Sequence, residues 1–589
     1  MNSAASRNSA GPERSRGGFG IRDAGDSAIL LELEPVIDPA VNARAIAIAT
    51  AIRDRRLPGI RDVIPTYRSV AVHFEPLTCD VDSLRRAMGE AAASPPISAS
   101  GALVEVPVAY GGDNGPDLDD VAAFAGLPMR TVIDRHCGPE YRVFMLGFLP
   151  GFAYMGIVDD SIAAPRKATP RTRIPPGSVG IAGRQTGVYP RPSPGGWQLI
   201  GRTSLDVFDP TREPASLFCA GDRVKFIPVE NLSLVENQSP VARTFAVRAD
   251  NGSHKGSRHE GEMSGRCLTV VRPGLFTTIQ DGGRWGCQDR GVPVSGPMDR
   301  QAHRLANALV GNAPDAATLE ATLLGPELRF DRSAVIAVAG ADLEAAIDDK
   351  PAAVDTPHRV EAGGVLRFGA RRSGTRTYIA IDGGVDVPVI LGSRSTHVVS
   401  GLGGVEGRAL RAGDRVPLGP PSNHVERKPL SFAPRVIGNG TIRGARLRVM
   451  RGPQDYYFED SALDWLTRTR FAVSPQSDRM GYRLVSGSEG TSPPSSIANP
   501  GKQGTFDRGA MISDAAFTGG IQIPQSGAPI LLMADRQTTG GYPQIATVIT
   551  ADLPLAGQLA PGDWIEFALC TRGEAIAALR EQQEAFGAG

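Results

Sequence analysis

Four positive side chains fall within eight residues of one another and could bind an anion. They lie among prolines that stiffen the backbone, and they are Arg166, Lys167, Arg171 and Arg173. A guanidinium offers a planar fork of donors to phosphate or carboxylate oxygens, and an ammonium adds a point charge. Judged on residue types alone, a solvated charged loop explains the same stretch at least as well.

A second set of polar residues occurs once in each half of the chain. A guanidinium, an amide, a hydroxyl and a phenol share one glycine-containing turn, which suits recognition of a lactam, a phosphate or a carboxylate. The repetition could equally preserve a hydrogen-bonded turn of a β barrel. Asp535, beside the second copy, could hold Mg²⁺ or form a local ion pair. The two copies are Arg184, Gln185, Thr186 and Tyr189, and Arg536, Gln537, Thr538 and Tyr542.

One histidine is a candidate for acid or base chemistry. His136 follows Val132 and Ile133 at helical spacing and precedes Gly138-Pro139. This position predicts a cap on the last carbonyls of a helix. Because an imidazole titrates in the useful range, a catalytic or phosphate-binding role is the alternative.

A polar loop and two tryptophans are further candidates. Ser393, Arg394 and Ser395 could bind anionic oxygens, or they could cap a barrel loop. Trp197 and Trp285, each beside a glycine, could form the wall of an adenine or lactam site, although buried packing is the more common role. The metal, if any, is left unassigned.

The elements that must position these residues are mainly β strands, preceded by a small α+β domain at residues 20–95. Beyond it, alternating strands and Gly/Pro turns predominate, apart from helical stretches at 117–137 and 298–310. Within the first domain, Asp38-Pro39 and Asp80 each start a helix. The first of these helices has one apolar stripe, formed by Val41, Ala45, Ile48 and Ile52.

Composition and a short repeat divide the rest of the chain. Residues 250–266 have almost no apolar side chains, which places a linker at 241–266. We therefore predict β domains at 100–240, 267–425 and 430–575, after a disordered leader at 1–20. A Gly-Asp turn that feeds an alternating strand is expected to close each of them, at Gly221-Asp222, Gly413-Asp414 and Gly562-Asp563.

Charge and cysteine content exclude several classes of protein. The 63 basic and 63 acidic residues cancel, so a small molecule is a better expected partner than nucleic acid or a membrane surface. The six cysteines form no CxxC pair, so we expect neither a zinc site nor a disulfide framework, and the cytoplasm is the simplest location. No apolar run is long enough for a membrane span.

Two groups of long segments carry a family resemblance. GFLPGFAYM at 147–155 and PRKATPRTRIPPGSVGIAGRQTGVYPRPSPGGWQLIGRT at 165–203 resemble allophanate hydrolase subunit 1, which is also known as the 5-oxoprolinase B subunit. GLFTTIQDGGRWGCQDRGVPVSGPMD at 274–299 resembles subunit 2, the 5-oxoprolinase C subunit, as do LGSRSTHVVSGLGGVEGRALRAGD, SDRMGYRL and GGIQIPQSGAPILLMADRQTTGGYPQIATV. From residue 20 to about 570, the chain thus resembles a fusion of the two subunits.

The resemblance implies a mainly β fold in which cyclophilin-like barrels follow one another, one in the first half and two in the second. It also implies three alternative activities. These are ATP-dependent opening of 5-oxoproline with a separate LamB/YcsF-type 5-oxoprolinase component, carboxyl transfer in a biotin-dependent urea or amide carboxylase, and KipI/KipA-type regulation of a kinase. We predict the first. No Met precedes a Lys, so covalent biotin is not expected on this chain.

The cofactors and site residues follow from the resemblance. ATP and Mg²⁺ are implied by it alone, because no GxxxxGK[ST] motif occurs. The cations at 166–173 are then favoured as a clamp, and catalytic roles fall to His136, Arg184, Asp535 and Arg536. Replacing either arginine by Ala is expected to remove lactam-dependent ATP turnover while leaving the fold intact. Residues 20–240 and 267–575 are expected to reassociate as separate chains, and a homo-oligomer is left open.

Overall fold

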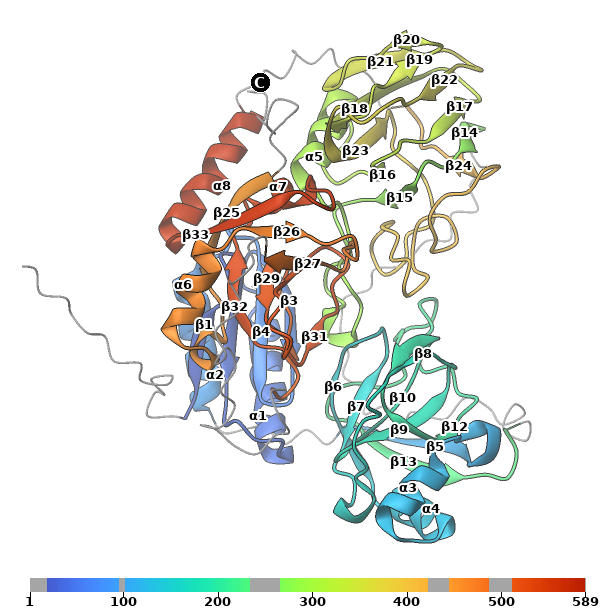
Figure 1. Ribbon diagram of the computed structural model, residues 1–589, viewed down its shortest axis with the longest axis vertical. Coiled ribbons are helices and arrows are strands. Elements are labelled where there is room, and N and C mark those ends of the chain that lie inside the picture. The colour runs from blue at the N-terminus through green and yellow to red at the C-terminus, as the bar shows by residue number, and fades with distance from the viewer. Residues whose placement is uncertain (1–17, 95–100, 233–264, 422–443, 487–510, 588–589) are drawn as a thin grey trace, which may run out of the picture.

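The computed structural model describes residues 18–94, 101–232, 265–421, 444–486 and 511–587. Most of the predicted leader, most of the predicted linker and the boundary expected between 425 and 430 lie outside these residues. The described chain forms four units in sequence order. The first unit lies beside the fourth, and the second and third lie at opposite ends of the molecule (Figure 1).

The first unit is an antiparallel sheet with two helices on one face. As predicted, Asp38 and Asp80 cap these helices by accepting hydrogen bonds from their first N–H groups. The predicted apolar stripe packs into the core between helices and sheet. The sheet has the order β1-β2-β4-β3. The elements are β1 (Gly20–Asp23), β2 (Ala28–Glu32), α1 (Pro39–Asp54), β3 (Ile60–Pro65), β4 (Ser69–Phe74) and α2 (Val81–Ala93).

The second unit is a closed seven-stranded barrel with the circular order β5-β12-β9-β10-β7-β6-β13. Its first and last strands pair in parallel, which closes the barrel. The helical stretch expected at 117–137 is two helices, because Gly126 adopts a left-handed φ and ends the first of them. The elements are β5 (Leu103–Tyr110), α3 (Leu118–Ala125), α4 (Met129–Cys137), β6 (Tyr141–Leu146), β7 (Ala153–Gly156), β8 (Arg171–Ile174), β9 (Ser178–Ala182), β10 (Gln185–Val188), β11 (Ser193–Gly195), β12 (Gln198–Arg202) and β13 (Arg223–Pro228).

The third unit differs from the barrel expected at 267–425. It has two sheets, β20-β19-β22-β17-β14-β24 and β15-β16-β23-β18-β21, and side chains from both form one core between them. Alternating strands need only one buried face, which a sandwich supplies as well as a barrel does. The elements are β14 (Cys267–Arg272), β15 (Phe276–Gln280), α5 (Arg300–Leu309), β16 (Thr318–Thr322), β17 (Glu327–Phe330), β18 (Ala334–Asp342), β19 (Ala346–Ile347), β20 (Lys350–Pro351), β21 (Thr356–Val360), β22 (Val365–Arg367), β23 (Ser373–Ile381) and β24 (Arg415–Pro417).

The fourth unit is a second closed barrel, with the circular order β25-β32-β29-β30-β27-β26-β33. This order matches the first barrel strand for strand, and its first and last strands also pair in parallel. The elements are β25 (Gly444–Arg451), α6 (Asp460–Arg468), β26 (Phe471–Val473), β27 (Gly481–Ser486), β28 (Asp514–Ala515), β29 (Gly520–Gln522), β30 (Ile530–Leu532), β31 (Thr539–Gly540), β32 (Gln544–Val548), α7 (Leu553–Gly557), β33 (Trp564–Leu569) and α8 (Arg572–Gly587).

The Gly-Asp repeat is a turn with the same geometry in all three places, as predicted. Each glycine has a positive φ, of 96° at Gly221 and 89° at Gly413 and Gly562. Each aspartate accepts a hydrogen bond from the N–H three residues earlier, at 2.8, 2.7 and 2.8 Å for Asp222, Asp414 and Asp563. The strands β13, β24 and β33 begin directly afterwards and pair with the first strand of their unit.

The first unit uses the other face of its sheet to pack on the last unit, which joins the two ends of the chain. Ala24, Leu30 and Ile64 share a buried cluster with Ala515 and Phe517. The six cysteines are all free thiols. None of the helices in the described ranges has the length and apolar character needed to cross a membrane.

Candidate functional site

A cavity of about 140 Å³ lies where the first, third and fourth units meet. Strands β3 and β4 of the first unit supply Arg61 and His73, and the third unit supplies Trp285 and Arg300. Phe517 of the fourth unit completes the wall. The cavity therefore combines cationic, aromatic and apolar groups, a composition typical of a small-ligand site.

Two guanidinium groups line this cavity with one carboxylate between them. Arg61 forms an ion pair with Glu75, and its guanidinium carbon lies 4.6 Å from the centre of the Trp285 ring. Arg300 begins α5, and within the described residues its buried Nε has no hydrogen-bond partner. Burial, with smaller contributions from Arg304 and Arg61, lowers the pKa of Arg300 to about 10. An added carboxylate or phosphate would supply the missing acceptor.

His73 is a neutral, buried imidazole at the same cavity. Burial, with help from Arg536 and Arg61, holds the pKa of His73 well below its ordinary value. Its ring lies 5.3 Å from that of Phe517 and 6.4 Å from that of Trp285. The Nε2 atom is buried and has no hydrogen-bond partner in the described part of the chain. It could therefore donate to or accept from a polar ligand.

A chain of hydrogen bonds runs beside the cavity through three units. Asp62 accepts from the Gly286 N–H at 3.0 Å and from the N–H and side chain of Gln288 at 3.2 and 3.0 Å. The side-chain oxygen of Gln288 accepts from Arg536 at 2.8 Å, and Arg536 also donates to Thr518 at 2.9 Å. Burial, against the hydrogen bonds of Gln288 and Gly286, raises the pKa of Asp62 to about 6.

A second buried network ties the third unit to the fourth. Arg479 forms a two-pronged ion pair with Asp535, at 2.9 and 3.0 Å, and also pairs with Glu320. Tyr378 donates to Glu320 at 2.6 Å. Burial opposes ionisation of Asp535, but the charges of Arg479 and His397 hold its pKa below the ordinary value. Both oxygens of Asp535 thus accept hydrogen bonds from Arg479, which is the ion pair given as the alternative to a Mg²⁺ ligand.

The residues predicted in the second copy of the turn lie at this junction. Arg536 is only 2% exposed, and Thr538 is fully buried. The carbonyl of Gln537 accepts a hydrogen bond from Arg536 at 3.3 Å, whereas the Tyr542 side chain reaches the surface. Arg536 approaches the cavity closely enough to affect His73. Trp285, one of the two candidate wall residues, does line the cavity.

The residues predicted in the first copy lie in the first barrel and have other partners. Arg184 is exposed and pairs with Asp160 at 2.8 Å. Gln185 lies in β10 opposite Ala182, and Tyr189 is buried in an aromatic cluster that also contains Trp197. The structure therefore does not bring the two copies into one site.

The two copies also occupy different places in barrels of the same topology. Arg184 precedes β10, whereas Arg536 follows β30, the strand that corresponds to β10. The strand that comes after β10 is β11, and the strand that comes after β30 is β31. Each of these pairs with a short strand outside the barrel, β8 or β28, so the connection after β10 corresponds to the connection after β30. The two turns are therefore not equivalent loops, although the barrels themselves match.

His136 lies inside the first barrel, away from the carbonyls at the end of its helix. Its Nδ1 is 2.8 Å from the Tyr110 hydroxyl, and its Nε2 is 2.9 Å from the Thr186 hydroxyl. The ring stacks on Phe226 with 4.6 Å between centroids. Burial lowers the pKa of His136 to about 3, so it is neutral near pH 7. The structure brings together His136 and Thr186, two predicted residues, as a hydrogen-bonded pair within a core.

The cations at 166–173 are partly neutralised. Lys167 and Arg171 both donate to the buried carboxylate of Asp117, at 2.8 and 2.6 Å. Arg166 and Arg173 are exposed. The stretch thus offers two exposed charges to a ligand instead of four.

The loop at 393–395 is organised around a carboxylate of its own. Ser393 and Ser395 donate to one oxygen of Asp281 at 2.6 and 2.7 Å, and the Arg394 N–H donates to the other at 2.5 Å. The Arg394 side chain pairs with Asp386 at 2.7 Å. These donors support the loop-capping alternative, because they are already engaged by acceptors within the protein.

Several residues of the cavity and its neighbouring network carry no signal in the local sequence, namely Arg61, His73, Arg300 and Glu320. Trp285 and Gln288 fall within the segment 274–299, whose resemblance to subunit 2 is strong. Arg479 falls within SDRMGYRL, and Met533 and Ala534 of the cavity wall fall within 519–548, so the family resemblance was the signal that pointed toward this region. No group of three or more His, Cys, Asp or Glu side chains placed to hold a metal ion occurs among the residues that the structure describes.

Two family models match the chain and together account for most of it. The model described as "Carboxyltransferase domain, subdomain C and D" matches residues 19–218, and "Carboxyltransferase domain, subdomain A and B" matches residues 290–569. The crystal structure of TTHA0988 shares 33% sequence identity with a TM-score of 0.73, covering 92% of this chain and 99% of that one. The arrangement of all four units thus has a solved counterpart.

Curated relatives match each half separately. The 5-oxoprolinase C subunit of Escherichia coli (strain K12) is 37% identical over 54% of this chain and 96% of its own length. The 5-oxoprolinase B subunit of Bacillus subtilis (strain 168) is 42% identical over 36% of this chain and 93% of its own length. The urea amidolyase of Lachancea kluyveri is 33% identical over 51% of this chain but only 16% of its own length. The chain therefore belongs to the carboxyltransferase-domain family that includes the B and C subunits of 5-oxoprolinase, and it carries counterparts of both in one polypeptide.

Proposed function

We propose that this chain is the fused B and C component of a cytoplasmic 5-oxoprolinase, which uses ATP to open 5-oxoproline or a similar lactam. The observation that carries the proposal is the cavity, because its walls come from both halves. Arg61 and His73 belong to the half that resembles the B subunit, and Trp285 and Arg300 belong to the half that resembles the C subunit. A site built in this way requires both subunits.

The cavity suits a ring that carries a carboxylate and an amide. In the proposed complex, Arg61 and Arg300 bind the carboxylate, and Trp285 packs against the ring. The unpartnered Nε2 of His73 hydrogen-bonds the lactam amide. Each of these roles uses a group that the free protein leaves with unused hydrogen-bonding capacity or exposed ring surface.

The reaction proceeds in three steps. The lactam oxygen attacks the terminal phosphorus of ATP, which releases ADP and, with loss of the amide proton, forms an imidoyl phosphate. Water then adds to the activated carbon, and the C–N bond breaks as the nitrogen takes up a proton, which opens the ring to an acyl phosphate. A second water hydrolyses the acyl phosphate to the open amino acid and phosphate. Mg²⁺ would reach the protein bound to ATP, where it neutralises phosphate charge. A separate LamB/YcsF-type 5-oxoprolinase component is the proposed partner for the hydrolytic step.

The proposal is tested by measuring ADP release with 5-oxoproline, with and without the LamB/YcsF-type partner. We expect ADP release to depend on the lactam. Arg300→Ala should raise the KM for 5-oxoproline roughly 10-fold or more, since a charge-assisted hydrogen bond is lost. Arg304→Ala is the matched control, because Arg304 lies on the same helix but does not line the cavity. ADP release that ignores the lactam in every combination would overturn the proposal.

Carboxyl transfer is the second candidate, because both family models are named for that activity and a urea amidolyase matches half of the chain. In that case the same cavity would receive a urea or amide acceptor, and carboxybiotin would arrive on another chain. Incubation with a carboxylated biotin carrier and urea distinguishes the two. Transfer of the carboxyl group, together with the absence of lactam-dependent ATP turnover, would favour this candidate over the first.

A further inference from the structure

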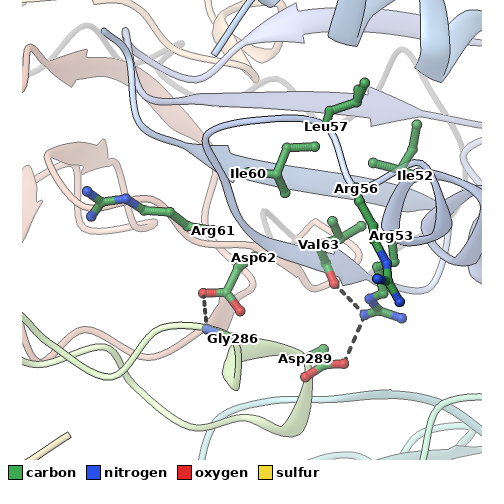
Figure 2. A pocket seen from close by; sticks show the side chains of 10 residues that line it. All are labelled: Ile52, Arg53, Arg56, Leu57, Ile60, Arg61, Asp62, Val63, Gly286 and Asp289. Atoms are coloured by element: carbon green, nitrogen blue, oxygen red, sulfur yellow. Dashed lines mark hydrogen bonds and ion pairs between the residues drawn. The ribbon is translucent and has the colours of Figure 1, made fainter. Parts of the chain in front are cut away.

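A groove of about 410 Å³ opens on the surface next to the cavity, between the first and third units. It lies between the end of α1, strand β3 and the short helical turn at Gln288–Arg290 (Figure 2). The lining residues are Ile52, Arg53, Arg56, Leu57, Ile60, Arg61, Asp62, Val63, Gly286 and Asp289. Of these residues, only Ile52 was named from the sequence pattern, as part of the apolar stripe of the first helix.

The groove has more cations than its carboxylates can neutralise. Its lining holds three arginines and two aspartates. Arg53 is paired with Asp289 at 2.9 Å, and Asp62 is occupied by N–H groups of the third unit. Arg56 has no ion-pair or hydrogen-bond partner for its side chain within the described ranges, and it is exposed. The groove is therefore left with one uncompensated positive charge at its edge.

Arg56 also holds a backbone conformation that its residue type disfavours. It follows the end of α1 with a φ of 47°, a left-handed position that glycine normally occupies. A non-glycine residue there costs about 1 kcal/mol or more. Residues retained in such conformations occur preferentially at ligand sites. The guanidinium that the groove leaves unpaired is thus also the one kept at a conformational cost.

Apolar side chains lie beside these cations. Leu57 and Ile60 are half-buried and face the groove together with Arg53 and Arg56 (Figure 2). A ligand that fits both surfaces needs an anionic end and a flat or apolar end. The volume of the groove lies in the range of pockets that take ligands of nucleotide size.

Arg61 connects the groove with the inner cavity, because it lines both. Its guanidinium lies over Trp285, a wall residue of the cavity. Its guanidinium pairs with Glu75 and points away from Arg53 and Arg56 (Figure 2), so Arg61 lies between the two sites. This position suits a residue that lies between two substrates that react with each other.

We propose that the groove binds a nucleoside polyphosphate, with the phosphates on Arg53 and Arg56 and the base against Leu57 and Ile60. The inference rests on the proposed function for the role of this nucleotide, which would deliver its terminal phosphate toward the cavity. Binding itself is independent of turnover. The groove is also a rival to Arg166 and Arg173 as the site of the phosphates.

The test is calorimetric titration of the full chain with ADP, pyrophosphate and adenosine, without a lactam. Arg56→Ala should weaken ADP and pyrophosphate binding at least 10-fold. Arg56→Gly should do the same while unfolding at the same temperature as wild type or a higher one, because glycine suits the left-handed backbone. Arg55→Ala is the control of equal charge, since Arg55 is adjacent in sequence but pairs with Glu90 outside the groove.

Three results would overturn the inference. They are unchanged ADP affinity in both Arg56 variants, equal losses in Arg55→Ala and Arg56→Ala, and loss on Arg166→Ala alone. Tight ADP binding that depends on Arg56, without lactam-dependent turnover, would support the groove and refute the 5-oxoprolinase proposal. Lactam-dependent turnover that persists in both Arg56 variants, with normal ADP affinity, would support the 5-oxoprolinase proposal and refute the groove as the nucleotide site. The two proposals can therefore fail separately.

Discussion

The two seven-stranded barrels share one strand order but differ in where they lie within the molecule. The first is peripheral, and its polar interior pair, His136 and Thr186, has hydrogen-bond partners within the barrel. The second is central, and Arg536 donates a hydrogen bond across a boundary to Gln288 of another unit. Arg184, the residue with a similar sequence context in the first barrel, pairs with Asp160 at the surface. Position in the assembly, more than barrel topology, thus decides which loops can form a site.

Separating the halves tests the central position of the second barrel and has the largest expected effect. Residues 18–232 and 265–587, made as two chains, should form a 1:1 complex at micromolar concentration, which corresponds to about 8 kcal/mol or more of association free energy. The second chain should retain α8, because Ala575 and Ala578 are buried against the barrel. Gel filtration with light scattering measures the complex. Two independent peaks would mean that the shared cavity does not hold the halves together.

Arg536→Ala should cost roughly 2 to 4 kcal/mol of unfolding free energy, because it leaves the buried oxygen of Gln288 and the half-buried hydroxyl of Thr518 without a donor. Denaturant unfolding followed by fluorescence measures the loss. This outcome differs from the expectation that the fold would remain intact. An Arg536→Ala variant as stable as wild type would show that the fold does not depend on the Arg536 side chain. A catalytic role for Arg536 would then gain support.

The pH dependence of Asp62 has a smaller effect and a defined sign. Its pKa is about 6 in the folded protein and 3.8 in the unfolded chain, so the folded state binds more protons between these values. The stabilising contribution is therefore complete below pH 3.8 and is lost as the pH rises through 6. Relative to Asp62→Asn, wild type should lose roughly 1 kcal/mol between pH 5 and 7. Parallel curves for the two proteins would place the carboxylate in a solvated setting instead.

Arg184→Ala should have the smallest effect, below about 1 kcal/mol, because its ion pair with Asp160 is exposed and largely screened. Lactam-dependent ADP release should also remain close to the wild-type rate. Denaturant unfolding and lactam-dependent ADP release, measured for Arg184→Ala and Arg536→Ala side by side, give a direct comparison. If turnover falls while stability does not, the first barrel contributes to the site after all, and the catalytic role predicted for Arg184 stands.

Local features of the fold could be predicted from the sequence. Asp38 and Asp80 cap helices because a side-chain oxygen reaches the next N–H groups, which depends only on neighbouring residues. The Gly-Asp turns are local in the same sense. The family resemblance, and not periodicity, was needed for the barrels. Even so, the third unit is a two-sheet sandwich where a barrel was expected. Alternation within each strand does not determine whether the edge strands pair with each other to close a barrel.

The candidate site was harder to predict, because its residues are far apart in the chain. Arg61, Trp285 and Phe517 meet only after three units have packed together. By contrast, Arg184 and Arg536 share a sequence context because both stand in glycine-containing turns, which recur wherever strands must reverse. Similar short turns therefore indicate only that the backbone reverses direction at both places. The cavity depends on contacts between distant residues, which no short segment encodes.

The side-chain amide of Gln288 makes the pairing of the two halves selective. Its nitrogen end is held by Asp62 of the first half and its oxygen end by Arg536 of the second. The amide nitrogen can only donate and the amide oxygen can only accept, so a partner with an apolar or basic residue at position 62 would leave the buried nitrogen without an acceptor. Each such mismatch costs about 1 to 3 kcal/mol. In relatives that encode the halves as separate chains, an equivalent contact would discriminate against subunits from another complex.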